Sequence, residues 1–509
     1  MKMIKRLFNF MGKRLFILGF LVFLEILFFV VFLANFSYLF RFLEIIFRLF
    51  GLVVVLCIIR YNEKPGNQIL WIVLIMLFPF VGSILYLLGG LNIITDKHIR
   101  KVNRKEKETE YLLRQDKKVL QNVIKENSYA GSDFNFLNNC NYPVYDNTDV
   151  KYYKCGEDAF DDMLLELNKA KKYIFLEYFI ITPGIMWTAI LDILKRKVKE
   201  GVEVRVMYDD VGCINTLPTY YKDALEAFGI KCIPFNRVSP FVQLVVNNRD
   251  HRKMMIIDGK TVFTGGINIA DEYINKIERY GYWKDSVLKI TGDAVWTYIV
   301  MFLRTWDGIS REEIDYYKYK VKGDSKKAKG YVSPYGSNPF RKDYIAEEAY
   351  LNIITHANKY IYIMTPYLVL DSDILSALTL AAKRGVEIKI MLPGIPDKKY
   401  IYMLSRSYYR PLIKSGIKIY EYNPGFLHTK MMVADDLVCS IGTINLDYRS
   451  LYLHFECSSF MYECPCIKDI RDDFVDCLKK CTEVDMDDAS PNIRREIIQI
   501  LLRLFAPLL

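Results

Sequence analysis

Two short segments of the sequence carry the same pattern of reactive side chains. HRKMMIIDGKTVFTGGIN begins at His251 and HTKMMVADDLVCSIGTIN begins at His428, in a protein with only five histidines. Four matching positions after a given histidine arise by chance on the order of once in 50,000, so a pattern held twice is a strong signal. The four shared positions are Lys253, Asp258, Gly265 and Asn268 in the first segment and Lys430, Asp435, Gly442 and Asn445 in the second.

These residue types suit chemistry on a phosphodiester. Its negative charge repels nucleophiles and its alkoxide leaving group is poor, so one imidazole attacks while another supplies a proton. Lysine and asparagine donate hydrogen bonds as charge builds on the phosphoryl oxygens, the role that a metal otherwise takes. We therefore predict His251, His428, Lys253 and Lys430 as catalytic and expect no metal or other cofactor. The eleven cysteines include no CxxC pair that would indicate zinc.

The remaining shared residues have more than one interpretation. Asn268 and Asn445 are predicted to bind the substrate phosphate. Asp258 and Asp435 complete the catalytic pattern, but each could instead cap the turn that follows a strand. A pair of structural histidines in a duplicated core is the alternative to catalysis, and the double occurrence of the whole pattern disfavours it.

The histidine and lysine of each segment must share one face of an element. The residues that follow them, MMII and MMVA, form short apolar runs typical of buried strands. Side chains two residues apart on a strand point the same way, so His251 and Lys253 should lie together, as should His428 and Lys430.

The body of the chain is an internal repeat of α/β units. AKKYIFLEYFII at Ala170 resembles ANKYIYIMTPYL at Ala357, an offset of 187, and the histidine segments have an offset of 177. We predict two similar lobes, residues 131–320 and 341–490, joined by a linker at 321–340. About ten additional residues between Asn236 and His251 form either a surface loop or a lip that contacts lipid.

Two long apolar runs predict membrane-spanning helices within residues 1–95. The first extends from Leu15 to about Ile59 and the second from Ile69 to Leu88. A helix of about 20 apolar residues crosses a bilayer, so the second run fits one span and the first holds one or two. Lysine and arginine clusters flank both ends, which predicts two spans, a multi-pass protein and lobes on the cytoplasmic side of the cell membrane.

The positive charge is concentrated beside this membrane region. The whole chain has a formal net charge of +10, and residues 1–110 hold 15 Lys and Arg against 7 Asp and Glu, a net +8. A nucleic-acid enzyme carries its basic residues in the catalytic body, so nucleic acid is not the expected partner. The expected partners are anionic membrane lipids.

Two flanking segments are predicted as helices. Residues 96–130 are charged and predict a solvated connecting helix. In residues 491–509, Ile493, Ile497 and Ile500 fall on one helical face, as in an interfacial helix drawn to anionic lipid. Packing of this face on the second lobe is the alternative.

The twin HxKxxxxD motifs, each followed by a glycine-containing turn and an asparagine, resemble the phospholipase D superfamily. The resemblance covers both lobes and implies an α/β fold in which two similar lobes follow the N-terminal transmembrane helices and share one active site. It also implies that downstream carboxylates, Asp285 in YWKD and Glu456 in HFE, orient the histidines. His251 as the nucleophile and His428 as the acid are implied in the same way.

Three further segments resemble bacterial cardiolipin synthases. They are WIVLIMLFPFVGSILYLLGG, NLDYRSLYLHFE after the second motif, and the terminal RLFAPLL. The resemblance implies transfer of a phosphatidyl group between two phosphatidylglycerol molecules, giving cardiolipin and glycerol through a phosphohistidine. A membrane-bound phospholipase D that hydrolyses its lipid is the alternative enzyme. A lipid-binding scaffold with a decayed site is disfavoured because both motifs are complete.

Overall fold

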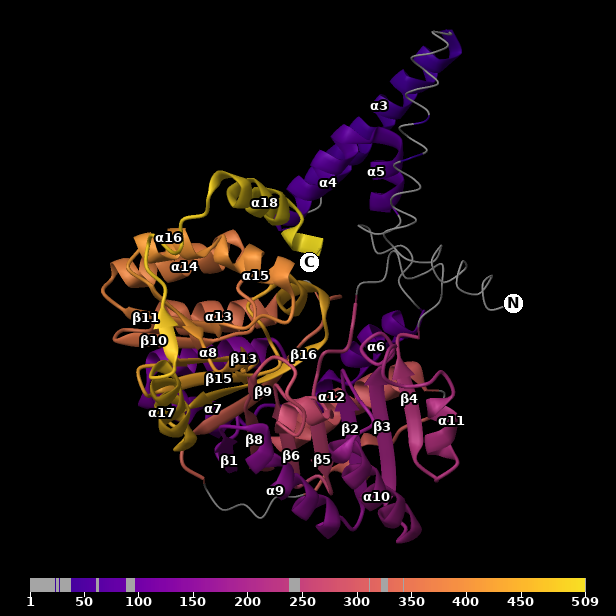
Figure 1. Ribbon diagram of the computed structural model, residues 1–509. Coiled ribbons are helices and arrows are strands. Elements are labelled where there is room, and N and C mark those ends of the chain that lie inside the picture. Colours follow the sequence, from indigo (N-terminus) through magenta and orange to yellow (C-terminus); the bar gives the residue numbers. More distant parts are fainter. Residues whose placement is uncertain are drawn as a thin grey trace. The chain divides into compact units, whose positions relative to one another are not determined.

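The chain folds as two compact units, one containing the N-terminal apolar helices and the other containing residues 98–237 and 248–502 (Figure 1). The additional segment predicted in the first lobe falls largely on residues 238–247, outside the described residues. The computed structural model describes residues 23, 27, 38–60, 64–87, 97–237, 248–310, 312–321, 328–341 and 343–508.

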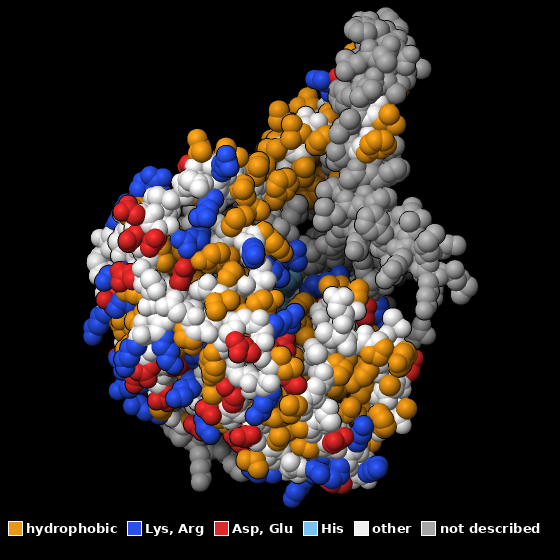
Figure 2. All heavy atoms as spheres, viewed as in Figure 1, with side chains coloured by type: hydrophobic (Ala, Val, Ile, Leu, Met, Phe, Trp, Pro, Cys, Tyr) orange, Lys and Arg blue, Asp and Glu red, His pale blue; other side chains and the backbone are white. Residues whose placement is uncertain are grey.

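Helix α3 (Tyr38–Arg60) is the one helix, among the described residues, that is long and apolar enough to cross a membrane, over Phe42–Arg60. Only 17% of the span is buried, and Phe42, Leu49 and Leu56 are 58%, 57% and 59% exposed. Figure 2 shows hydrophobic side chains in orange on the surface of the N-terminal helices. Two charges inside the span, Glu44 and Arg48, pair with each other at 2.7 Å. Pairing one helical turn apart lowers the cost of both charges in an apolar region.

The sequence predicted one continuous membrane-spanning helix from Ile69 to Leu88. The structure does not show one in the second apolar run. This run is divided into α4 (Pro65–Leu77) and α5 (Pro79–Leu85). Phe78 between them has φ −134° and ψ 77°, because a residue before proline avoids the helical region and Pro79 lacks an N–H. Residues 15–22, 24–26 and 28–37 of the first run lie outside the described residues, so two spans remain a prediction.

The first lobe is built on a mixed seven-stranded sheet in the order β1-β8-β6-β5-β2-β3-β4. Strands β2, β3 and β4 pair in parallel, and the remaining pairs are antiparallel. The strands are β1 (Thr148–Tyr153), β2 (Tyr173–Tyr178), β3 (Glu203–Asp209), β4 (Lys231–Phe235), β5 (Met254–Ile257), β6 (Thr261–Gly265) and β8 (Val287–Gly292).

The second lobe repeats this sheet with one additional edge strand, in the order β17-β12-β11-β10-β14-β15-β16-β9. From β12 to β9 the order and directions match those from β4 to β1, which confirms two similar α/β lobes. The strands are β9 (Tyr331–Ser337), β10 (Tyr360–Met364), β11 (Glu387–Pro393), β12 (Lys418–Tyr422), β14 (Met431–Ala434), β15 (Val438–Gly442), β16 (Glu456–Tyr462) and β17 (Cys481–Glu483).

The predicted linker at 321–340 is shorter than the sequence indicated. Its second half contains β9, which pairs with β16 along its whole length and is buried at every residue. The segment YVSPYGS lacks the apolar run that marks the other strands, so its composition resembled a linker.

The predicted single connecting helix at 96–130 is instead three α-helices: α6 (Lys97–Glu108), α7 (Lys117–Glu126) and α8 (Ser128–Asn139). The first break has local causes. Gln115 accepts a hydrogen bond from the Val144 amide at 2.8 Å, and Asp116 caps α7 through the Lys118 amide. Helix α8 contacts β9 and so belongs with the second lobe.

Helices cover the sheets and join the lobes. Helix α12 is buried over almost its whole length and contacts strands of both sheets, where Tyr298 bonds Ser459 at 2.7 Å. The helices of this unit include α9 (Gly156–Lys169), α10 (Ile185–Lys199), α11 (Tyr221–Glu226), α12 (Val295–Ile309), α13 (Ile345–His356), α14 (Ser372–Lys383), α15 (Lys399–Arg406), α16 (Tyr409–Lys414) and α17 (Cys466–Leu478).

The C-terminal segment forms helix α18 (Ile493–Leu504), as its periodicity predicted. None of its residues is buried, and Ile493, Ile497 and Ile500 are 74%, 55% and 61% exposed. An unburied apolar face favours the interfacial helix over packing on the second lobe.

Candidate active site

The strands predicted after the two motif histidines form as expected. β5 and β14 are buried at all their residues and occupy matching places in the two sheets. His251 and His428 precede these strands and are 8% and 7% exposed. The strands thus hold both imidazoles at nearly buried positions.

The two predicted carboxylates contact the histidines, and each contacts the histidine of the other lobe. Nδ1 of His251 lies 2.9 and 3.0 Å from the carboxylate oxygens of Glu456. Nδ1 of His428 lies 2.6 Å from Oδ2 of Asp285. With a carboxylate as acceptor, each Nδ1 carries the proton and each Nε2 has its lone pair free to react.

Backbone hydrogen bonds between the lobes fix this crossed arrangement. The amide of His251 donates to the carbonyl of Phe455 at 2.9 Å, and the amide of His428 donates to Lys284 at 2.7 Å. Beside the second contact, β7 (Tyr282–Lys284) and β13 (Gly425–Leu427) form a two-stranded parallel ladder between the lobes. Each histidine–carboxylate pair therefore joins a residue of one lobe to a residue of the other.

A glycine of the first motif makes room for one of the carboxylates. A Cβ at Gly266 would overlap Oδ1 of Asp285. Asp285 is fully buried, and its other oxygen accepts from His428. The glycine after the strand is therefore required for the close approach of the orienting carboxylate.

Asp258 and Asp435 lie at the far ends of β5 and β14, away from the imidazoles. Both have left-handed backbone, with φ 52° and 58°. Asp258 accepts from three successive backbone amides that lead into β2, and Asp435 does the same before β10. These contacts fit turn capping, the second role considered from the sequence.

The motif lysines are buried beside the histidines. The ammonium of Lys253 donates to the carbonyl of His251, and that of Lys430 donates to His428. Burial lowers the pKa of Lys253 to about 8 and that of Lys430 to about 7, while nearby carboxylates oppose the shift. An ammonium has three donors, so both lysines retain N–H groups for a phosphate, whose charge would raise their pKa.

The two motif asparagines differ in how far their side-chain amides are already engaged. Asn268 accepts from the Ile180 amide at 3.0 Å and donates to the Tyr273 hydroxyl at 2.7 Å. Asn445 is 6% exposed, and within the described part of the chain its Oδ1 has no hydrogen-bond partner. Each side-chain nitrogen carries two hydrogens, so binding of phosphate by both residues stays a prediction.

Burial keeps both imidazoles neutral. Burial and the Lys253 ammonium hold the pKa of His251 well below 6.5. Burial and Lys430 lower the pKa of His428 to about 4, with Asp285 opposing. A neutral imidazole is the form that attacks, and the negative charge of a bound phosphodiester raises the pKa of a neighbouring imidazole that must act as an acid.

Aromatic rings missed by the sequence reasoning enclose the histidines. Phe179 packs 5.0 Å from the His251 ring, and Tyr273 and Trp283 pack 5.5 and 5.4 Å from the His428 ring, measured between centroids. Isolated aromatic residues carry no motif, so this role could not be predicted from the sequence. Such walls limit the access of water to the imidazoles.

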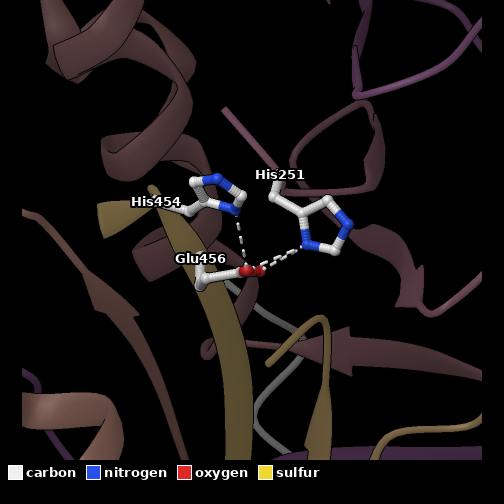
Figure 3. Close-up of side chains that lie close together, drawn as sticks. All are labelled: His251, His454 and Glu456. Atoms are coloured by element: carbon white, nitrogen blue, oxygen red, sulfur yellow. Dashed lines mark hydrogen bonds and ion pairs between the residues drawn. The ribbon is translucent and has the colours of Figure 1, made fainter. Parts of the chain in front are cut away.

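His454 is a third histidine in the site that the sequence reasoning also missed. Figure 3 shows its ring beside that of His251, with both imidazoles directed at the Glu456 carboxylate, and the two ring centroids are 5.7 Å apart. Its Nδ1 lies 3.8 Å from Oε1 of Glu456. The only signal in the sequence was its position two residues before Glu456, which was already a candidate.

His251, His454 and Glu456 are also the group of side chains in the site best suited to bind a metal ion. Their ligand atoms lie within 4.8 Å of one another. Two imidazoles and a carboxylate are a common zinc or iron set. However, Nδ1 of His251 and Glu456 are already joined by a hydrogen bond, and Lys253 and Lys430 place positive charge nearby. The arrangement therefore favours a phosphate over a cation.

Comparison with known proteins agrees with this geometry. Residues 163–281 and 350–478 match the family model described as "Cardiolipin synthase, PLD-like domain", and residues 49–90 match the phospholipase D-nuclease N-terminal family. An uncharacterized protein of Streptococcus mutans is 42% identical over 459 residues, which cover 89% of this chain and 99% of that protein. Cardiolipin synthase 2 of Bacillus anthracis is 33% identical and covers 88% of each chain.

Among solved structures, the phosphatidylserine synthase of Haemophilus influenzae matches with a TM-score of 0.55 at 16% identity, covering 71% of this chain and 93% of that one. At this identity the match shows the fold. Both lobes match the family model, and relatives named cardiolipin synthase share a third of their residues along most of the chain. The chain therefore belongs to the cardiolipin synthase family of phospholipase-D-like phosphatidyltransferases.

Proposed function

We propose that this protein is a cardiolipin synthase that transfers a phosphatidyl group from one phosphatidylglycerol to a second and releases glycerol. The observation that carries the proposal is the pair of crossed contacts, His251 with Glu456 and His428 with Asp285. They give one buried site two neutral imidazoles, each with Nε2 available. The name of the Bacillus anthracis relative supports the choice of lipid substrate.

In the first step, Nε2 of His251 attacks phosphorus and forms an N–P bond. When the phosphodiester binds, its negative charge raises the pKa of His428, which takes up a proton at Nε2. The bond from phosphorus to the glycerol oxygen breaks, and that oxygen takes this proton from His428, so that glycerol leaves. The developing positive charge on His251 is stabilised by Glu456. Lys253 and Lys430 donate to the phosphoryl oxygens as they gain charge.

In the second step, a hydroxyl of another phosphatidylglycerol attacks the phosphohistidine. His428 accepts the hydroxyl proton, the N–P bond breaks, and cardiolipin forms with both imidazoles returned to their starting state. Water would give phosphatidic acid instead. Burial of both histidines, with 8% and 7% exposure, favours the lipid hydroxyl over water.

We further propose that the protein is a multi-pass protein of the cell membrane with both lobes on the cytoplasmic side. The apolar α3 and the flanking lysine and arginine clusters support this placement. The exposed isoleucines of α18, with Arg494 and Arg495 close by, suit contact with an anionic lipid surface.

A product assay tests the proposed function. Purified full-length protein in phosphatidylglycerol vesicles should form cardiolipin and glycerol in equal amounts, and activity should persist after treatment with excess EDTA. Phosphatidic acid as the main product would establish hydrolysis, the alternative reaction. A loss of activity in EDTA that added zinc restores would contradict the metal-free mechanism and point to the His251, His454 and Glu456 cluster.

A further inference from the structure

His454 is buried in the site without the hydrogen bonds that a buried imidazole requires. It is 7% exposed, and it directly follows a π-helix (Arg449–Leu453), two residues before the start of β16. Within the described residues, neither of its ring nitrogens has a hydrogen-bond partner. A buried donor or acceptor that makes no hydrogen bond costs stability, so packing alone is a poor explanation for a histidine at this position.

The internal repeat supplies a matched position for comparison. His454 stands two residues before Glu456, and Trp283 stands two residues before Asp285. The Trp283 ring centroid is 5.4 Å from that of His428, and the His454 centroid is 5.7 Å from that of His251. At this matched position, a titratable imidazole lies beside His251 where an indole lies beside His428.

The His454 ring is directed at the carboxylate that orients His251. Figure 3 shows both imidazoles approaching Glu456 through Nδ1. Glu456 already accepts from Nδ1 of His251 at 2.9 Å and from the Thr443 hydroxyl. Nδ1 of His454 is 3.8 Å away, so a shift of about 1 Å would bring it within hydrogen-bond distance.

Because of the charges around Glu456, a third hydrogen-bond donor to this carboxyl group would affect whether it is ionised. Burial raises the pKa of Glu456 to about 8, while Lys253, Thr443 and Ser450 oppose the shift. Burial, followed by His251 and Arg449, holds the pKa of His454 well below 6.5, so its ring is neutral. The ionisable groups that interact with these two side chains include His251, Lys253, Lys430, Arg249, Arg449, Asp447 and Tyr350.

We propose that His454 is a positioning residue that donates its Nδ1 hydrogen to Glu456 and so keeps this carboxyl group ionised opposite His251. The contact shortens when His251 becomes positively charged on attack, because Glu456 must then carry its full negative charge. A protonated Glu456 could not accept from Nδ1 of His251, and the reactive Nε2 tautomer would be lost. The inference rests on the proposed catalytic use of His251.

Loss of the donor should change the pH dependence of turnover in one direction. Activity requires ionised Glu456, so it is present above the pKa of this group and falls as the pH drops through it. Removing a hydrogen bond to the ionised form raises that pKa further. The acid limb of kcat/KM should therefore move to higher pH.

Three variants of the full-length protein distinguish a role of His454 as a hydrogen-bond donor from a role in packing alone. His454→Phe removes the donor and keeps a ring, and the acid limb should rise by about 0.5 to 1 pH unit. His454→Asn keeps an N–H near the position of Nδ1, and the limb should stay within about 0.3 unit of the wild type. Trp283→Phe, at the matched position beside His428, should leave the limb unmoved.

The measured rate is total phosphodiester turnover in phosphatidylglycerol vesicles, so that phosphatidic acid as product would refute the proposed function yet leave the pH comparison readable. If His454→Phe does not purify folded, His454→Leu removes the same donor. An unmoved acid limb in the variant without the donor would overturn the inference. So would an equal shift in His454→Asn or in Trp283→Phe, because either would point to packing.

Discussion

Replacement of either motif histidine by alanine should reduce cardiolipin formation by about a thousandfold or more. His251 and His428 are both needed in each step, one to form and break the N–P bond and the other to move the proton. Because they act as a unit, the double variant should be little worse than either single variant. The measurement is the initial rate of purified variants in phosphatidylglycerol vesicles.

His356→Ala is the matched control. This histidine lies outside the site and bonds Asp133 at 2.8 Å in the second lobe. Its loss should lower stability slightly and leave the rate close to that of the wild type. A wild-type rate in folded His251→Ala or His428→Ala protein would be incompatible with the two-histidine mechanism.

Replacement of the orienting carboxylates should have the next largest effect, and the crossed geometry predicts which step each one impairs. Glu456→Gln and Asp285→Asn should each lower kcat by about 10²- to 10⁴-fold, because an amide no longer fixes the reactive tautomer or stabilises the imidazolium. The fully buried carboxylates lie against His251 and His428 respectively, so the Glu456 variant should fail in attack and the Asp285 variant in proton transfer.

A substrate with a nitrophenyl leaving group distinguishes the two variants, because this group needs no proton to leave. The release of nitrophenol in the first turnover should recover in Asp285→Asn and remain slow in Glu456→Gln. Asp162→Asn, which removes an ion pair with Lys289 at 2.9 Å outside the site, is the control. The opposite pattern would contradict the assignment of Glu456 to the attacking histidine and of Asp285 to the proton donor.

Much of the fold was predictable because the sequence repeats itself. The buried runs MMII and MMVA became β5 and β14, and the offsets between the halves matched two sheets of the same strand order. Strand β9 was missed because its burial comes from pairing with β16 rather than from an apolar sequence. The break between α4 and α5 was visible as Pro79, but the length of the apolar run concealed it.

The candidate site was predictable residue by residue but not in its connections. Asp285 and Glu456 follow the first and second motifs, and nothing in a nearly symmetric sequence indicates that each contacts the other lobe's histidine. That exchange depends on contacts between lobes, such as the His428 amide with the Lys284 carbonyl at 2.7 Å. His454 was overlooked because it belongs to neither motif.

The most direct test of the proposed mechanism is to locate the covalent intermediate. In His428→Ala protein given the nitrophenyl phosphodiester lipid, His251 can still attack, and the adduct should accumulate because the second step lacks its base. Peptide mapping should place the phosphatidyl group on His251, and His251→Ala protein should form no adduct. Label on His428 in His251→Ala protein, with none on His251 in His428→Ala protein, would contradict the account by reversing the two roles.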